Sequence, residues 1–164
     1  MKFTKNLNAL SEIEFISIFG SVFEKSEWIA YEAFKEKPFK DSKDLIDKMI
    51  NIYNKCSKEK TTEIFNLHPK LAIEKKLTNF SSKEQSGAQL DKCTEEEFLE
   101  FNKLNSNYEK KFKFPFIIAV KGKNKNHILN DFRTRIDNNY ETEFNEAKIQ
   151  VKKIALLRLE EILN

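Results

Sequence analysis

Apolar residues recur every three or four positions along most of this chain, which is the spacing of one face of an α-helix. Residues that favour helix starts, together with a few glycines and prolines, separate these stretches. The periodicity therefore predicts a mainly helical protein. The expected helices begin at or near Ser11, Ser26, Ser42, Thr62, residues 79–82, Thr94, Asn124 and Glu141.

Several of the expected helix boundaries rest on particular residues. Ser11 and Glu14 have the spacing of a capping box, and Gly20 is placed to end that helix. The fourth helix must end by His68, because Pro69 follows and a residue before proline is driven out of the α-helical region. The expected caps of the first three helices are Ser11, Ser26 and Ser42.

One apolar stretch, residues 112–120, breaks the helical period. It is short and rich in apolar and β-branched residues, so its periodicity alone fits a buried strand. Nothing else in the sequence offers a strand to pair with it. We therefore expect an extended, buried segment at a junction between helices, ended by Gly122.

The composition agrees with an all-α fold of seven or eight helices in one domain over residues 1–164. Three glycines and three prolines are too few for the turns of a β-sandwich or barrel. A chain of 164 residues can bury a core without support from metals or disulfides. Cys56 and Cys93 form no recognisable spacing, so we expect two thiols in a reducing compartment.

Charge and hydropathy disfavour two classes of partner. The formal net charge is +3, and the lysines are interspersed with acidic residues, so no segment is typical of nucleic-acid binding. No early apolar run resembles a signal peptide, and no run is long enough to span a bilayer. We expect no nucleic-acid partner, no membrane partner and a cytoplasmic location.

Polar residues near the break after the fourth helix are the first candidates for chemistry. His68 could act as a general acid or base, although its spacing alone favours a helix-end histidine bonded to backbone. Ser81 and Glu84 fit a capping box, which is a structural role. A helix start there would also offer N–H groups to an anion or a carbonyl oxygen. Gln85 adds an amide that both donates and accepts.

An arginine interrupts the apolar stripe of the last expected helix. At 100° per residue, Arg158 falls in the middle of that stripe. It could extend to the rim of the core or pair with a buried acidic residue. It could otherwise point into a pocket and bind an anionic or carbonyl-rich ligand. The apolar members of the stripe are Phe144, Ala147, Val151, Ile154, Ala155 and Ile162.

Common catalytic and metal-binding motifs are absent from the sequence. His127 has no nearby ligand set, and neither HExxH nor a Cys/His cluster occurs, so no metal site is expected. The chain also lacks GxSxG, a phosphate-binding glycine loop and a dinucleotide fingerprint. What remains is a small acid–base site built from His, Glu, Ser, Gln and Arg side chains.

Five short motifs, in order and over nearly the whole chain, resemble the OHCU decarboxylase family. Each motif is weak alone, but five in register are specific. The motifs are Phe19-Gly20-x-Val22-x-Glu24-x-Ser26-x-Trp28-Ile29-Ala30, His68-Pro69-x-Leu71-Ala72, Ser81-x-x-Glu84-Gln85-Ser86-Gly87-Ala88, Leu104-Asn105-x-x-Tyr108-x-x-Lys111-Phe112-x-Phe114-Pro115-Phe116 and Ile154-Ala155-x-x-Arg158-Leu159.

The resemblance implies an all-α fold, a homodimer and no cofactor. It implies that the small-molecule substrate is 2-oxo-4-hydroxy-4-carboxy-5-ureidoimidazoline (OHCU), which is decarboxylated to (S)-allantoin and CO2 in the last step of urate degradation. It also implies that His68 is the catalytic residue and that Glu84 supports it. The implied substrate-binding residues are Pro69, Ser81, Ser82, Lys83, Glu84, Gln85, Phe116, Ile117, Ile118, Ala119, Val120 and Arg158.

Some positions depart from the family pattern. Gln89 and Lys113 stand where glycine is expected, which concerns local backbone geometry and not the chemistry. Lys70 stands where an acidic residue is common, and it should affect only the outer charge of the pocket. The alternative interpretation is a helical interaction module without enzymatic activity, which would place His68 far from Arg158.

Overall fold

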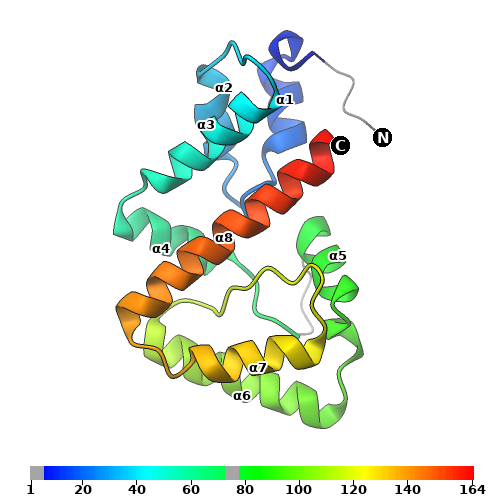
Figure 1. Cartoon of the computed structure of the whole chain (residues 1–164), viewed down its shortest axis with the longest axis vertical. Coiled ribbons are helices and arrows are strands. Elements are labelled where there is room, and N and C mark those ends of the chain that lie inside the picture. Colours follow the sequence, from blue (N-terminus) through cyan, green and yellow to red (C-terminus); the bar gives the residue numbers. More distant parts are fainter. Residues whose placement is uncertain (1–5, 73–77) are drawn as a thin grey trace. The chain divides into compact units, whose positions relative to one another are not determined.

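The computed structural model of this chain describes residues 6–72 and 78–164, and in these ranges it contains helices and no strand (Figure 1). The all-α prediction is confirmed, and eight α-helices agree with the predicted seven or eight. Two short 3₁₀ helices, η1 and η2, accompany them. The elements are η1 (Leu7–Ala9), α1 (Glu12–Phe19), α2 (Trp28–Lys35), α3 (Ser42–Asn54), α4 (Lys58–Leu67), α5 (Asn79–Gly87), η2 (Leu90–Lys92), α6 (Glu95–Phe112), α7 (Lys125–Arg135) and α8 (Tyr140–Leu163).

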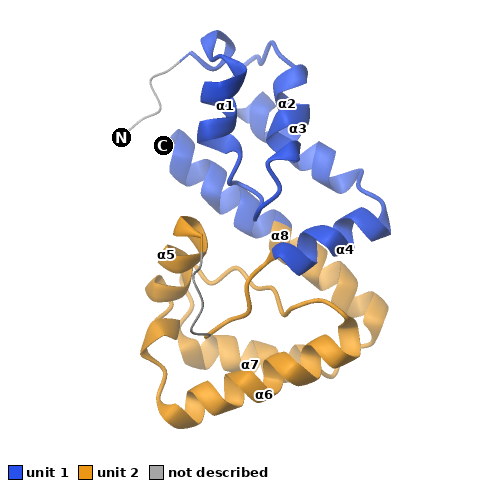
Figure 2. Cartoon of the chain, turned by 180° about the vertical axis from the view of Figure 1, so that it is seen from behind, with its two compact units in different colours: residues 1–67, 152–164 blue, residues 68–151 orange. Residues whose placement is uncertain are grey.

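The chain divides into two compact units (Figure 2). Unit 1 comprises residues 1–67 and 152–164, and unit 2 comprises residues 68–151. Helix α8 therefore contributes its first half to unit 2 and its second half to unit 1. The single domain over residues 1–164 remains a prediction.

Unit 1 is built around helices α1, α2 and α3, which contact one another in sequence order. Aromatic rings fill the space beside α1: the Phe15 centroid lies 4.8 Å from that of Phe19 and 5.7 Å from that of Phe39. Ser11 and Glu14 form the predicted capping box, and Gly20 is the C-cap, as predicted. A Cβ atom at Gly20 would lie 2.5 Å from the carbonyl oxygen of Ile16, so the close backbone approach requires glycine.

Two predicted caps in unit 1 are wrong. Helix α3 is capped by Asp41, whose side chain accepts from the N–H of Asp44, and Ser42 is the first helical residue. The Ser26 hydroxyl instead donates to the carbonyl oxygen of Glu24 at 3.0 Å, and Glu27 precedes α2 without a side-chain cap. Both serines lie within two residues of the real boundary, where propensity alone does not select the capping residue.

Unit 2 is organised around α6 and α7, which run side by side (Figure 1). Residues 114–120 follow α6 as an extended, non-helical segment, and all seven are buried. This confirms the predicted extended, buried segment, although it begins two residues later than expected, because Phe112 is the last residue of α6 and Lys113 is its C-cap. The chain turns at Gly122, whose φ of 77° lies in the left-handed region that glycine adopts without strain.

Two further expectations concern the cysteines and the membrane. Cys56 and Cys93 are not joined in a disulfide, as predicted. Within the part of the chain that the structure describes, no helix combines the length and hydropathy that crossing a bilayer requires.

Candidate active site

The first predicted site residue, His68, lies immediately after the end of α4. The helix ends at Leu67, and His68 is buried, with 9% of its surface exposed. Pro69 follows and excludes His68 from the helix, as predicted. The following backbone turns sharply, because Ala72 takes a left-handed φ of 51°. His68 therefore opens a short, strongly bent segment, residues 68–72.

The side-chain amide of Gln85 on α5 holds this bent segment at two points. Its oxygen accepts a hydrogen bond from the backbone N–H of Ala72, and its nitrogen donates to the carbonyl oxygen of Lys70, each at 3.1 Å. Gln85 is 7% exposed, so both bonds are shielded from water. The structure thus brings two predicted site segments together, since α5 also carries Glu84.

Helix α6 contacts the same segment from another side. The Asn105 side chain donates to the carbonyl oxygen of Leu71 at 3.0 Å, and the Lys70 ammonium pairs with Glu109 at 2.7 Å. Lys70 and Glu109 are both partly exposed, so this pair has a small effect on stability. Asn105 is 4% exposed, so its hydrogen bond is the stronger constraint on the segment.

Helix α5 begins earlier than the sequence suggested, and this changes the role of Ser81. Thr78 is the N-cap, and its hydroxyl accepts from the N–H of Ser81 at 3.3 Å. The predicted capping box of Ser81 with Glu84 is therefore wrong. Ser81 lies inside the first turn and is buried, so the helix start is located at residues 78–80.

The predicted substrate-binding residues of α5 differ in exposure. Ser81 and Gln85 are buried, Glu84 is half-buried, and Ser82 and Lys83 are exposed. Positions 81, 84 and 85 share one helix face because they are three and four residues apart. The two exposed residues lie on other faces of the same helix.

The second predicted wall, residues 116–120, is fixed within unit 2 by side chains of α7 and α8. The carbonyl oxygen of Ile117 accepts from Arg135 Nη1 at 2.8 Å, and the N–H of Ala119 donates to the Gln150 side chain at 2.9 Å. The Phe116 ring stacks on Phe132 with centroids 3.8 Å apart. The Phe116 ring is therefore part of the hydrophobic core of unit 2.

A buried ionic cluster that the sequence analysis missed supports this wall. Arg135 donates from Nη2 to Glu143 at 2.6 Å and from Nε at 2.9 Å. Tyr108 and Asn138 also donate to the Glu143 carboxylate, which is fully buried. Burial raises the pKa of the Tyr108 phenol, and the adjacent Glu143 carboxylate raises it further. These bonds satisfy the charges that burial would otherwise make costly.

Signals for this cluster were present in the sequence. Tyr108 stands in the fourth family-like motif, and Arg135 stands three residues after buried Phe132 and seven after buried Ile128. That spacing puts Arg135 on the buried face of α7. Arg158 stands out because its helix is apolar around it, whereas the mostly polar sequence of α7 makes Arg135 inconspicuous.

Arg158 belongs to unit 1, where it pairs with Glu24. Both Nη atoms of Arg158 lie 3.2 Å from Oε2 of Glu24, and each side chain is 2% exposed. Nη1 also donates to the carbonyl oxygens of Ser21 and Val22, at 3.2 Å and 3.5 Å. One of the predicted alternatives, pairing with an acidic residue in the core, is therefore present. The apolar stripe is buried as predicted, except that Ile162 is partly exposed.

The two positions where glycine was expected, Gln89 and Lys113, have unusual backbone geometry. Gln89 has a φ of 61° and Lys113 a φ of 65°, both in the left-handed region. These are conformations for which glycine carries no steric penalty. The chain keeps this geometry without glycine at either position. Lys113 ends α6 as its C-cap, donating its N–H to Glu109 at 2.9 Å.

Comparison with known proteins gives a match to the family model described as OHCU decarboxylase over residues 8–160. A "Uric acid degradation bifunctional protein" of Bacillus sp. (strain TB-90) is 40% identical over 158 residues, which cover 96% of this chain and 32% of that protein. The chain thus spans about a third of the length of this relative. A "2-oxo-4-hydroxy-4-carboxy-5-ureidoimidazoline decarboxylase" of Haloferax volcanii is 34% identical over 157 residues, covering 96% of this chain and 94% of the relative.

A solved structure agrees with the sequence matches. The crystal structure of an OHCU decarboxylase in the presence of (S)-allantoin superimposes with a TM-score of 0.73 and 25% sequence identity. The superposition covers 87% of this chain and 94% of that one. The similarity therefore extends over most of both chains.

Proposed function

Because this chain belongs to the OHCU decarboxylase family, we propose that it decarboxylates OHCU to (S)-allantoin and CO2, without a cofactor, in the last step of urate degradation. The observation that carries the proposal is the family match over residues 8–160, which includes every proposed site residue. The relatives' own names describe this reaction or the pathway that contains it.

The geometry of unit 2 is compatible with this chemistry. His68 lies on a segment whose backbone is held by Gln85, and Glu84 precedes Gln85 on the same helix. We assign His68 as the catalytic acid–base group and Glu84 as the carboxylate that supports it. A carboxylate that accepts a hydrogen bond from an imidazole N–H fixes the orientation and tautomer of the ring.

The proposed reaction breaks one carbon–carbon bond. The substrate carboxylate leaves as CO2, and the electron pair of the broken bond spreads into the neighbouring C=N or C=O system of the ring. His68, as the acid–base group, accepts or donates the proton of the hydroxyl group or of the developing enol. A proton then adds to carbon from one face, which produces a single enantiomer of allantoin.

The remaining assigned residues bind and orient the substrate. Residues 116–120 supply an apolar wall with backbone groups, and Pro69 fixes the bend beside the histidine. The α5 residues contribute polar contacts. The assigned binding residues are Pro69, Ser81, Ser82, Lys83, Glu84, Gln85, Phe116, Ile117, Ile118, Ala119, Val120 and Arg158.

The pairing with Glu24 favours one of two roles for Arg158. Tight binding of the departing carboxylate would stabilise the ground state and would not accelerate its loss. Since the carboxylate of Glu24 balances the positive charge, the pair carries no net charge with which to hold that group. A neutral pair can still donate hydrogen bonds, so we assign Arg158 to the ureido or ring carbonyl, to which its N–H groups would donate as negative charge develops there.

The decisive test supplies freshly made substrate, because OHCU decays spontaneously. Urate oxidase and hydroxyisourate hydrolase generate it from urate, and loss of substrate absorbance is followed with the circular dichroism of the product. We expect faster decay and optically active allantoin. Folded protein that leaves the spontaneous rate unchanged would refute the proposal.

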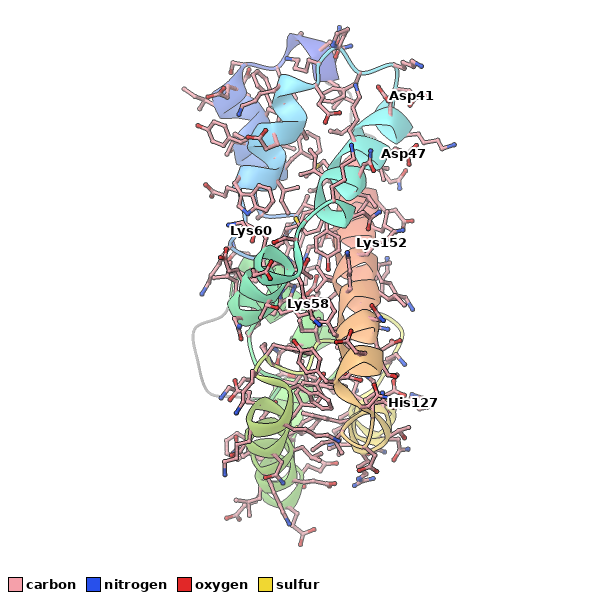
Figure 3. The ribbon with its side chains drawn as sticks, turned by 90° about the vertical axis from the view of Figure 1, so that its left-hand side faces the viewer. Asp41, Asp47, Lys58, Lys60, His127 and Lys152 are labelled. Atoms are coloured by element: carbon pink, nitrogen blue, oxygen red, sulfur yellow. The ribbon has the colours of Figure 1, made fainter. Side chains whose placement is uncertain are left out.

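The role of His68 is tested separately. We expect His68→Asn to lose the acceleration and His127→Asn to retain it, because His127 is exposed at the start of α7 (Figure 3). Full activity in His68→Asn would refute only the role of that residue. A homodimer and a cytoplasmic location belong to the same proposal, and light scattering of the purified protein tests the first.

A further inference from the structure

We propose that Asn105 and Gln85 are positioning residues whose side-chain amides fix the backbone after His68 and so set the direction of its imidazole. The proposal rests on the proposed decarboxylase function, in which His68 is the catalytic group. It assigns a role to Asn105, which stands in the fourth family-like motif but was given no role by the resemblance, and it changes the role of Gln85 from substrate contact to support.

Three successive residues of one segment are held by side chains from two different helices. Gln85 on α5 bonds to Lys70 and Ala72, at 3.1 Å each, and Asn105 on α6 bonds to Leu71 at 3.0 Å. The backbone of residues 70–72 thus has a side-chain partner at each residue. Such density of contacts on irregular backbone indicates that its exact position matters.

The segment needs this support because its backbone conformation is unfavourable. Ala72 has a φ of 51°, a left-handed conformation in which the Cβ atom of a non-glycine residue is crowded. A strained conformation persists only when the surroundings enforce it, and such strain is concentrated at functional sites. When the amide bonds are lost, the segment relaxes and His68 moves with it.

The one hydrogen bond that the Asn105 side chain makes in the described part of the chain is to the segment after His68. The Asn105 nitrogen donates to Leu71, while its buried oxygen has no hydrogen-bond partner among the residues that the structure describes. A buried asparagine that leaves one polar atom unsatisfied carries a cost in stability. The donated bond to the segment after His68 is the evident compensation.

Gln85 is committed to the segment by both ends of its amide. The oxygen is occupied by the Ala72 N–H and the nitrogen by the Lys70 carbonyl. An amide used in this way acts on the substrate through the segment, which distinguishes a positioning residue from a binding residue. The two amides should therefore affect turnover more than substrate binding.

The test uses isosteric variants and a matched control on the same helix. Asn105→Asp and Gln85→Glu keep the side-chain size and remove the donating nitrogen. Asn107→Asp adds the same charge at an exposed position of α6. If the carboxylate at position 105 prevents folding, the smaller and uncharged Asn105→Ser replaces it. Each variant is measured for kcat, KM and the fraction folded.

A second readout reports directly on His68. The chain contains two histidines, so the ring Cε1–Hε1 signals in NMR spectra are readily assigned, and exposed His127 is an internal reference. We expect the His68 signal to move in Asn105→Asp and Gln85→Glu, while the His127 signal stays in place. Asn107→Asp should leave both signals unchanged.

The expected kinetic result is a fall in kcat of about 10- to 100-fold in each single variant, because a small displacement of a catalytic group is costly. KM should change by less than about threefold. Since both amides act on one segment, the double variant should lose less than the product of the single effects.

Two outcomes would overturn the proposal. Either single variant could retain kcat with the His68 signal unmoved, or Gln85→Glu could raise KM alone, which would make Gln85 a substrate contact. Wild-type protein without decarboxylase activity would refute the proposed function, while the His68 signal would still decide whether the amides position the histidine.

Discussion

The carboxylate of Glu24 receives both Nη groups of Arg158 on one oxygen atom, at 3.2 Å each. Glu24 stands in a loop that follows α1, and Arg158 stands near the end of α8, 134 residues later in the chain. Both side chains are 2% exposed, so neither charge is solvated by water. The pair therefore ties two distant parts of unit 1 together and holds the guanidinium in one orientation.

Removal of the Glu24 charge should destabilise unit 1. Glu24→Gln leaves the Arg158 guanidinium buried without a counter-charge, which should lower the free energy of unfolding by about 3 kcal/mol. Urea unfolding followed by circular dichroism measures this change. Glu36→Gln, at an exposed position of the same unit, should unfold like the wild type. An unchanged midpoint for Glu24→Gln would show that the pair contributes nothing to stability.

The N-cap of α5 is Thr78, and this assignment can be tested by comparing Thr78 with Ser82, a serine inside the helix. Thr78→Ala removes the acceptor for the N–H of Ser81 and should cost about 1 kcal/mol of stability. Ser82→Ala changes an exposed residue inside the helix and should have an effect below about 0.5 kcal/mol. Thermal unfolding of the two variants, compared with wild type, gives both values. Equal midpoints for the two variants would contradict the assigned cap.

Glycine at the end of α6 should stabilise the protein. Lys113 has a φ of 65°, so Lys113→Gly relieves steric crowding, partly offset by the greater freedom of glycine in the unfolded chain. We expect a net gain of about 0.5 to 1 kcal/mol in the free energy of unfolding. Lys103→Gly, at an exposed position in the interior of α6, should lose about 1 kcal/mol instead. A loss in both variants would argue against strain at position 113.

The buried Tyr108 phenol should make the folded protein less stable in alkaline solution. Burial, followed by the neighbouring Glu143 carboxylate, raises the pKa of Tyr108 in the folded protein. The unfolded state therefore releases the phenolic proton first, at about pH 10, and the stabilising contribution is lost as pH rises above that value. Urea unfolding between about pH 9 and 11 measures the slope.

Tyr108→Phe should have a shallower slope than the wild type over the same pH range. It should not abolish the slope, since burial also raises the pKa of Tyr53. Tyr31→Phe, which changes a partly exposed ring, is the matched control and should keep the wild-type slope. Identical slopes for Tyr108→Phe and wild type would contradict the raised pKa.

Much of the fold could be predicted from the sequence because each helix has apolar residues at a regular spacing. The end of α4 before Pro69 was predicted correctly. The buried stripe of α8 was predicted correctly except for Ile162, and the extended segment except for its first two residues, which belong to the end of α6. Caps were less predictable. Near Asp41, Ser42 and Thr78, several residues of similar capping propensity stand close together, and the backbone dihedral angles decide which one caps.

The contacts of the site were harder to predict for a different reason. Nothing in the local pattern of Asn105 or Gln85 shows that each amide bonds to a backbone 34 or 13 residues away. The spacing of Arg135 from Phe132 and Ile128 indicates that it is buried, but its pairing with Glu143 and Ile117 depends on tertiary packing. The roles of His68, Glu84 and Arg158 came from the family resemblance and remain proposals.

One face of helix α6 holds both of the predicted site segments of unit 2, residues 68–72 and 116–120. Asn105 bonds to the segment after His68, and Tyr108, three residues later, bonds to the Glu143 carboxylate that holds Arg135 against Ile117. One inserted or deleted residue before Asn105 would turn both side chains by about 100° and break both attachments at once. Natural length variation in this family should therefore avoid the middle of α6 and occur at exposed turns such as the one at Gly122.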